Sequence, residues 1–131
     1  MVGSATFHTA MAEIVVGSMV LATICAVGCS MARFLTISES NNEALMVTMD
    51  RASLAGSLLA LLFLPIVILS GNIAADGQAE SALLYNKFVY SGLALGFWSA
   101  FVIGRLRMGP GLWQVTSLSV LQSTTAALAF L

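Results

Sequence analysis

Residues 14–32 read IVVGSMVLATICAVGCSMA, nineteen consecutive residues without a charged side chain. At a rise of 1.5 Å per residue, a helix of this length spans about 28 Å, close to the roughly 30 Å hydrocarbon core of a bilayer. No basic residue precedes this run, and it is too long for the apolar region of a cleaved signal peptide. We therefore expect it to be a permanent membrane span that ends at Arg33.

Three further apolar runs follow along the chain. The second, ASLAGSLLALLFLPIVILS at 52–70, contains Pro65, which should kink its helix because proline removes a backbone hydrogen bond. The third ends at a pair of arginines, and the fourth follows the turn sequence Met108-Gly-Pro-Gly111. The sequence thus predicts an all-α integral membrane protein, a single domain over residues 1–131 that forms a four-helix bundle. The four transmembrane helices are expected at about 12–33, 52–71, 83–104 and 112–131.

The composition supports a lipid environment. Hydrophobic residues make up 59% of the 131 residues and charged residues only 8%, whereas a soluble domain usually carries about 25% charged residues. A chain this short cannot bury so much apolar surface in a water-surrounded core. The net charge is −1 and the five basic residues are scattered, so nucleic acid is not an expected partner.

The basic residues predict an orientation in the membrane. Arg33 and Arg51 flank the loop between the first two spans, and Arg105 and Arg107 flank the loop between the last two. Only Lys87 falls on the other side. Loops rich in Lys and Arg stay in the cytoplasm, so both termini are predicted to be extracytoplasmic in a cytoplasmic, or inner, membrane.

Small residues recur at helical spacing in the third span. Gly92, Gly96, Ala100 and Gly104 lie four residues apart and so share one helix face. Gly92 and Gly96 have the GxxxG spacing that lets two membrane helices approach closely. This stripe is predicted to pack either within the bundle or against a second subunit.

Two other features predict helix contacts. The first span repeats the small-residue spacing at Ser18, Ala22, Ala26 and Ser30. In the fourth span, Gln122 lies near mid-membrane, where an unpaired amide is costly. We therefore expect Gln122 to face another helix, a partner subunit or a water-filled cavity.

A polar cluster is predicted at the outer ends of the first and third spans. These spans run parallel, so Glu13 and Lys87 are expected at the same level, with His8 just outside them. The three residues could form a ligand or proton site, or a simple Glu–Lys latch between two helices. His8, with Met11 or Met19, could also supply axial ligands to haem, and the seven methionines admit copper.

The two cysteines admit two interpretations, as packing residues or as metal ligands. Cys25 and Cys29 are four residues apart on one helical face, a spacing that suits an intrahelical disulfide poorly. They are expected to act as small apolar packing residues, with ligation of a soft metal as the alternative.

Over residues 8–107 the chain resembles small four-helix membrane proteins of the copper-resistance (CopD-like) family and related haem-associated proteins. The resemblance is carried by His8 near the start of the first span, Gly17 within it, Arg51 before the second span and Gly71 at its end. Leu83-Leu84-x-x-Lys87 then opens the third span. This resemblance implies copper or haem as a cofactor.

The chain is also similar to small multidrug transporters, which have four short spans and an acidic residue in the first. Glu13 has the place of that acid. This similarity implies a small proton-coupled transporter that uses Glu13.

No enzyme motif is found in the sequence. A phosphate-binding glycine loop, paired histidines at zinc spacing and a nucleophile elbow are all absent. The leading hypothesis is therefore a non-catalytic accessory or scaffold subunit of a larger membrane complex, such as a respiratory or redox complex. Its expected partners are the lipid bilayer and either other membrane subunits or a second copy of the chain. The copper- or haem-binding protein and the proton-coupled transporter remain as alternatives.

Overall fold

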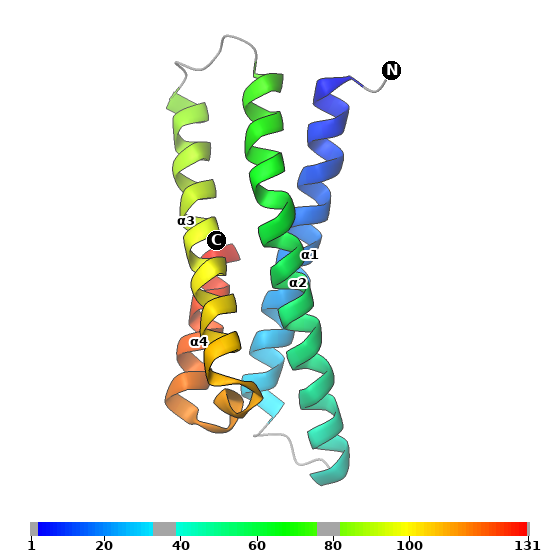
Figure 1. The fold of residues 1–131 in the computed structure, drawn as a ribbon, viewed down its shortest axis with the longest axis vertical. Coiled ribbons are helices and arrows are strands. Elements are labelled where there is room, and N and C mark those ends of the chain that lie inside the picture. Colours follow the sequence, from blue (N-terminus) through cyan, green and yellow to red (C-terminus); the bar gives the residue numbers. More distant parts are fainter. Residues whose placement is uncertain (1–2, 33–38, 76–81, 131) are drawn as a thin grey trace.

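A computed structural model describes residues 3–32, 39–75 and 82–130, and the regular structure in these ranges is entirely helical. The helices are α1 (Ser4–Ala32), α2 (Glu39–Ala74), α3 (Ala82–Met108), the short 3-10 helix η1 (Pro110–Gln114) and α4 (Thr116–Phe130). Figure 1 shows that successive long helices run in opposite directions. We call the end where α1 and α3 begin the His8 end, and the end where α3 finishes the Arg105 end.

Three helices are long and apolar enough to cross a membrane. They are Ser4–Ala32, Asn42–Ala74 and Ala82–Met108, with mean hydropathies of 2.2, 2.5 and 1.3 over their most apolar stretches. Their surfaces are apolar as well, since Leu62, Leu69 and Ile73 of α2 are each at least 63% exposed. The first three predicted spans are therefore confirmed in length and composition.

The fourth predicted span is divided between two elements. Gly109 has a φ of 70° and Pro110 opens η1, so the chain turns there before α4 begins. α4 has 15 residues, which corresponds to about 22 Å and falls short of the hydrocarbon core. In Figure 1 its end lies about halfway along the bundle. A fourth complete crossing stays a prediction.

The second helix is longer than the sequence predicted. α2 begins at Glu39, well before the predicted start of the second span at about residue 52, and continues without interruption through Pro65. The first turns of α2 lie before the apolar run at 52–70. They carry Asp50 on a buried face of the bundle.

Helices α1 and α2 form the most extensive contact in the bundle. A Cβ atom added to Gly56 would lie 2.9 Å from the Ser18 carbonyl oxygen and 3.2 Å from the Ala22 Cβ, so these two backbones approach closely. Ala22 and Ala26 are completely buried. The small-residue stripe of the first span therefore packs within the bundle, as predicted.

The large buried side chains gather toward the Arg105 end. Trp98 and Phe101 of α3 make an edge-to-face contact with ring centroids 5.5 Å apart, and Leu112 and Trp113 of η1 are almost fully buried. α1 and α3 do not pack closely on each other. Each instead packs against α2 and α4. Beyond the end of α4, toward the His8 end, the described part of the chain provides only α1, α2 and α3, and α2 stands between α3 and α1 in Figure 1.

Candidate functional site

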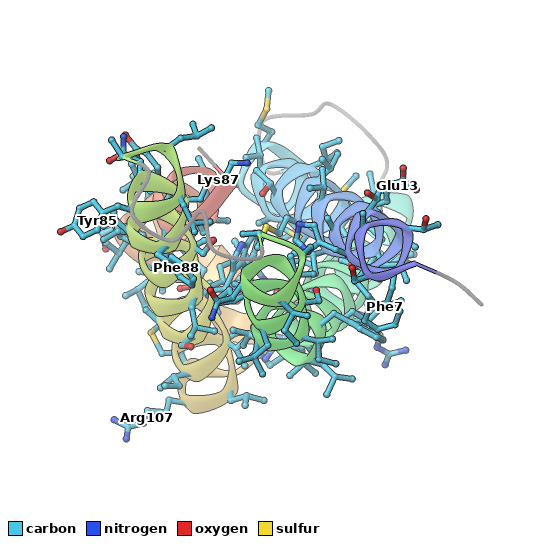
Figure 2. All side chains as sticks on the ribbon, turned by 90° about the horizontal axis from the view of Figure 1, so that it is seen from above. Phe7, Glu13, Tyr85, Lys87, Phe88 and Arg107 are labelled. Atoms are coloured by element: carbon cyan, nitrogen blue, oxygen red, sulfur yellow. The ribbon has the colours of Figure 1, made fainter. Side chains whose placement is uncertain are left out.

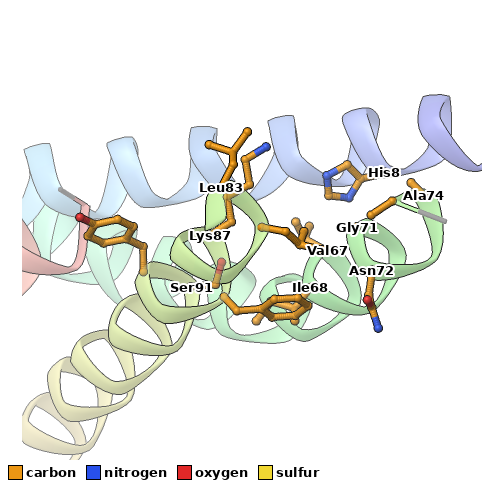
Figure 3. A pocket seen from close by; sticks show the side chains of 13 residues that line it. His8, Val67, Ile68, Gly71, Asn72, Ala74, Leu83, Lys87 and Ser91 are labelled. Atoms are coloured by element: carbon orange, nitrogen blue, oxygen red, sulfur yellow. The ribbon is translucent and has the colours of Figure 1, made fainter. Parts of the chain in front are cut away.

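A cavity of about 560 Å³ lies at the His8 end between α1, α2 and α3 (Figure 3). This volume is within the range of small-molecule sites, roughly 300–1,000 Å³. Its lining combines a few polar side chains with a larger set of apolar ones. The lining residues are His8, Val67, Ile68, Gly71, Asn72, Ala74, Ala75, Leu83, Leu84, Lys87, Phe88, Tyr90 and Ser91.

The His8 ring is held against α2 by a hydrogen bond. Its Nδ1 lies 3.1 Å from the Ser70 hydroxyl oxygen, and that hydroxyl donates in turn to the Val67 carbonyl at 3.1 Å. With the Ser70 hydroxyl donating to Val67, the Ser70 oxygen can accept a hydrogen bond from a protonated His8 Nδ1. The other ring nitrogen, Nε2, has no protein partner among the described residues.

Gly71 makes room for this ring. A Cβ atom at Gly71 would lie 2.8 Å from His8 Cε1, closer than real Cβ contacts allow. The glycine that ends the apolar run of the second span is therefore explained by the position of His8. No signal in the sequence connected these two residues.

Lys87 brings a positive charge to the same cavity. Figure 2 shows its side chain reaching from α3 toward α1. In the part of the chain that the structure describes, no carboxylate lies at ion-pair distance from Lys87. The two acids of the preceding loop, Asp76 and Glu80, lie outside the described residues.

Glu13 does not share this site. It is exposed, does not line the cavity, and lies on the side of α1 that faces away from α3 (Figure 2). Five residues separate His8 from Glu13, which rotates the two side chains by about 140° around a helix with 3.6 residues per turn. The structure therefore brings together His8 and Lys87 from the predicted cluster and places Glu13 apart from both.

A second cavity of about 490 Å³ adjoins the first, and the two share Val67, Tyr90 and Ser91 in their linings. It is almost wholly apolar. Its other lining residues come from all four long helices and are Ala12, Val15, Val16, Met19, Leu64, Leu93, Ala94, Phe97, Leu128 and Ala129. Leu128 and Ala129 belong to the last turn of α4, so this cavity lies where α4 ends.

The small-residue stripe of α3 divides into two parts. Gly92, Gly96 and Ala100 are exposed, and a Cβ atom built at either glycine would find nothing within 4 Å. Packing of these residues within the bundle, one of the two predicted alternatives, is therefore not what the structure shows. Contact with a second subunit stays a prediction.

Gly104, the last residue of the stripe, faces the interior. A Cβ atom there would lie 3.0 Å from Gln122 Oε1. Gln122 is buried, and its amide nitrogen donates to the Phe101 carbonyl at 2.5 Å. Gln122 thus faces another helix, which is one of the predicted environments for its amide.

The sequence did not predict a buried ion pair at the Arg105 end. The Arg105 guanidinium donates to both carboxylate oxygens of Asp50, from Nε and Nη2, at 2.5 Å each. The indole nitrogen of Trp113 donates to Asp50 Oδ1 at 2.6 Å. In the sequence, Asp50 lies just before the second apolar run and Arg105 lies at the end of the third. Because α2 and α3 are antiparallel, the start of the second apolar run lies beside the end of the third. This adjacency is the sequence signal that could have predicted the ion pair.

A cluster of hydroxyl groups joins α1 to α4. The Ser30 and Ser123 hydroxyls are hydrogen-bonded to each other, and the Ser119 hydroxyl donates to Ser30 at 2.7 Å. Ser123 also hydrogen-bonds the Ala26 carbonyl at 3.2 Å. The polar residues of the fourth span at 119 and 123 therefore satisfy one another and α1 in the interior.

The candidate metal and haem ligands lie in different places in the described part of the chain. Among the described residues, no group of three or more His, Cys, Asp or Glu side chains is placed to hold a metal ion. Met19 lines the second cavity and His8 the first, so neither cavity combines the histidine with a methionine. Cys25 and Cys29 are free and buried, and the Cys29 thiol donates to the Met46 carbonyl at 3.6 Å.

Comparisons with protein-family models, with curated proteins and with solved structures find no match to this chain. The resemblances to copper-resistance proteins and to small multidrug transporters therefore stay expectations from the sequence.

Proposed function

We propose that the protein is a non-catalytic membrane subunit that packs against a helix of another membrane protein through the outer face of α3. The observation that supports this proposal is the open stripe formed by Gly92, Gly96 and Ala100. A stripe of small residues gives no packing advantage against lipid, because lipid tails contact large and small apolar side chains equally well. A second helix can gain close backbone contact there.

Two features of α3 agree with this proposal. Over its most apolar stretch, α3 buries 17% of its residues within the chain, against 28% for α1 and for α2. Beside the stripe, Ile103 is 52% exposed and would form an apolar border of a helix–helix contact. The proposed partner is a membrane helix of a different subunit, with a second copy of this chain as the alternative outcome.

The test compares two glycines that are equally open in the isolated chain. Gly96→Leu should abolish the contact with the partner, because leucine separates the two backbones. Gly17→Leu is the matched control, since a Cβ at Gly17 of α1 also meets nothing within 4 Å. A photoreactive amino acid at Ala100 in living cells, followed by mass spectrometry of the adducts, identifies what lies against α3.

The proposal expects one specific protein adduct at Ala100, lost in Gly96→Leu and kept in Gly17→Leu. An adduct with the chain itself would assign the face to a homo-oligomer. Adducts with lipid alone, or equal adduct yields in the two glycine variants, would show that the stripe faces the bilayer and would overturn the proposal.

A further inference from the structure

We infer that the two adjoining cavities form one site for an anionic amphiphile with a single acyl chain. The acidic head would bind at Lys87 and His8, and the chain would extend along the apolar cavity toward the end of α4. This inference goes beyond the proposed subunit role and does not depend on it, because the site lies between α1 and α3 whereas the proposed subunit contact uses the outer face of α3.

The polar groups of the first cavity indicate where the head of the ligand binds. Lys87 reaches toward α1 (Figure 2) and has no carboxylate partner among the described residues. His8 lines the same cavity (Figure 3), with its ring fixed through Nδ1 and with Nε2 available. Lys87 is exposed and lines the cavity, and an ammonium beside an apolar lining favours an anionic partner. Nε2 can form a hydrogen bond with the head group.

The second cavity indicates where the tail of the ligand lies. It shares lining residues with the first cavity and is bordered by Val16, Leu93, Phe97 and Leu128. Along α3, ten residues separate Lys87 from Phe97, which corresponds to about 15 Å of helix. The apolar part of the site therefore continues from the charged end along the bundle axis, as an extended hydrocarbon chain would.

The geometry also separates this ligand from its nearest alternatives. A small inorganic anion would fill only the polar end and leave the apolar cavity of about 490 Å³ unexplained. A neutral chain would leave the Lys87 charge without a partner. The first cavity holds the two polar groups, His8 and Lys87, so we place the head there and a single chain in the second cavity. We therefore assign the site to a long-chain fatty carboxylate or a monoacyl phosphate, which share an anionic head on one chain.

The experiment uses the full chain in phosphatidylcholine nanodiscs with a palmitate analogue that carries a photoreactive group at the end of its chain. The expected adducts map to Leu93, Ala94 and Phe97 of α3 and to the end of α4. Unlabelled palmitate and a monoacyl phosphate should both compete, and the more potent of the two identifies the head group. Hexadecanol, which has the same chain without the charge, should compete about tenfold less well, the size of effect expected for losing one charge-assisted contact.

Two variants separate the two halves of the site. Lys87→Gln should lower the adduct yield about tenfold and Lys87→Arg should restore it, because arginine keeps the charge. Ala94→Phe should fill the apolar cavity and remove the adducts, whereas Gly92→Phe, on the outer face of α3, should leave them. Thermal unfolding of each variant, measured alongside, shows whether a lost adduct reflects lost folding.

Several results would overturn the inference. Equal competition by hexadecanol and palmitate would show that the head group is not recognised. An unchanged yield in Lys87→Gln would remove Lys87 from the site. Adducts spread over both faces of α3 would mean that the probe reports only dissolved lipid. None of these results bears on the Ala100 cross-link, so failure of this site and failure of the proposed subunit role are distinguishable.

Discussion

At the scale of single residues, the buried charges of the described residues are concentrated in one contact. Asp50 accepts two hydrogen bonds from Arg105 and one from Trp113, and the side chains of the ion pair are only 6% and 12% exposed. Such a bidentate pair satisfies the carboxylate in a region with little water. It joins α2, α3 and η1 at a single point.

Removing Arg105 should therefore be costly. Arg105→Gln leaves the Asp50 carboxylate buried without its ion-pair partner, and we expect a loss of about 3–5 kcal/mol in the free energy of unfolding. Arg107→Gln, an exposed arginine on the same helix end, should leave stability unchanged. Reversible unfolding in mixed detergent micelles measures both variants. The double variant Asp50→Asn/Arg105→Gln should recover part of the loss, and equal effects of Arg105→Gln and Arg107→Gln would show that the buried pair does not stabilise the fold.

At the scale of helices, periodicity and composition predict which segments are helical but not which face meets which neighbour. The runs at 14–32 and 52–70 fall inside α1 and α2. The small-residue stripe of α1 packs inside the bundle, whereas most of the matching stripe of α3 faces outward. Identical spacing in the two helices could not distinguish these outcomes, because they depend on how each helix is rotated about its axis. For the same reason Glu13 was wrongly grouped with His8, although the cavity between His8 and Lys87 follows from the parallel course of α1 and α3.

The close approach of α1 and α2 gives a prediction at this scale. Gly56→Ala places a Cβ atom against the backbone of Ser18 and Ala22, which cannot move aside as a flexible side chain could. We expect a destabilisation of about 1–3 kcal/mol from this overpacking. Gly17→Ala, where the added Cβ meets nothing, should instead be neutral or slightly stabilising, because alanine favours helix. Detergent-unfolding midpoints of the two variants provide the measurement, and a neutral Gly56→Ala would contradict the close approach.

At the scale of the whole molecule, the alternation of the helices places the described arginines near one end. Arg51, Arg105 and Arg107 lie toward the Arg105 end, and Lys87 lies toward the other. The sequence could predict this separation because it depends only on the number of spans between the charges. The sequence could not predict that α4 ends halfway along the bundle. The apolar residues continue through 112–131, which indicated a full span, but the turn at Gly109 and Pro110 and the short helix η1 use the first of these residues, so α4 begins only at Thr116.

The charge distribution predicts that the Arg105 end faces the cytoplasm. A cysteine at Ser4, near the start of α1, should react with a membrane-impermeant maleimide added to intact cells. A cysteine at Glu43, in the exposed first turns of α2, should react only after the cells are opened. Acidic residues contribute little to orientation, so Glu43→Cys should not itself invert the protein. The reverse labelling pattern would invert the proposed topology.

The uneven distribution of large side chains along the bundle also has a mechanical meaning. The Arg105 end is fastened by two tryptophans, a buried ion pair and a hydroxyl cluster, whereas the His8 end has cavities between its helices. Local opening is expected where few side chains are packed, so we expect the His8 end to open more readily than the Arg105 end. A change in the distance of α3 from α1 and α2 at the His8 end would leave the packing of the other half in place. We therefore expect that distance to depend on what occupies the two cavities.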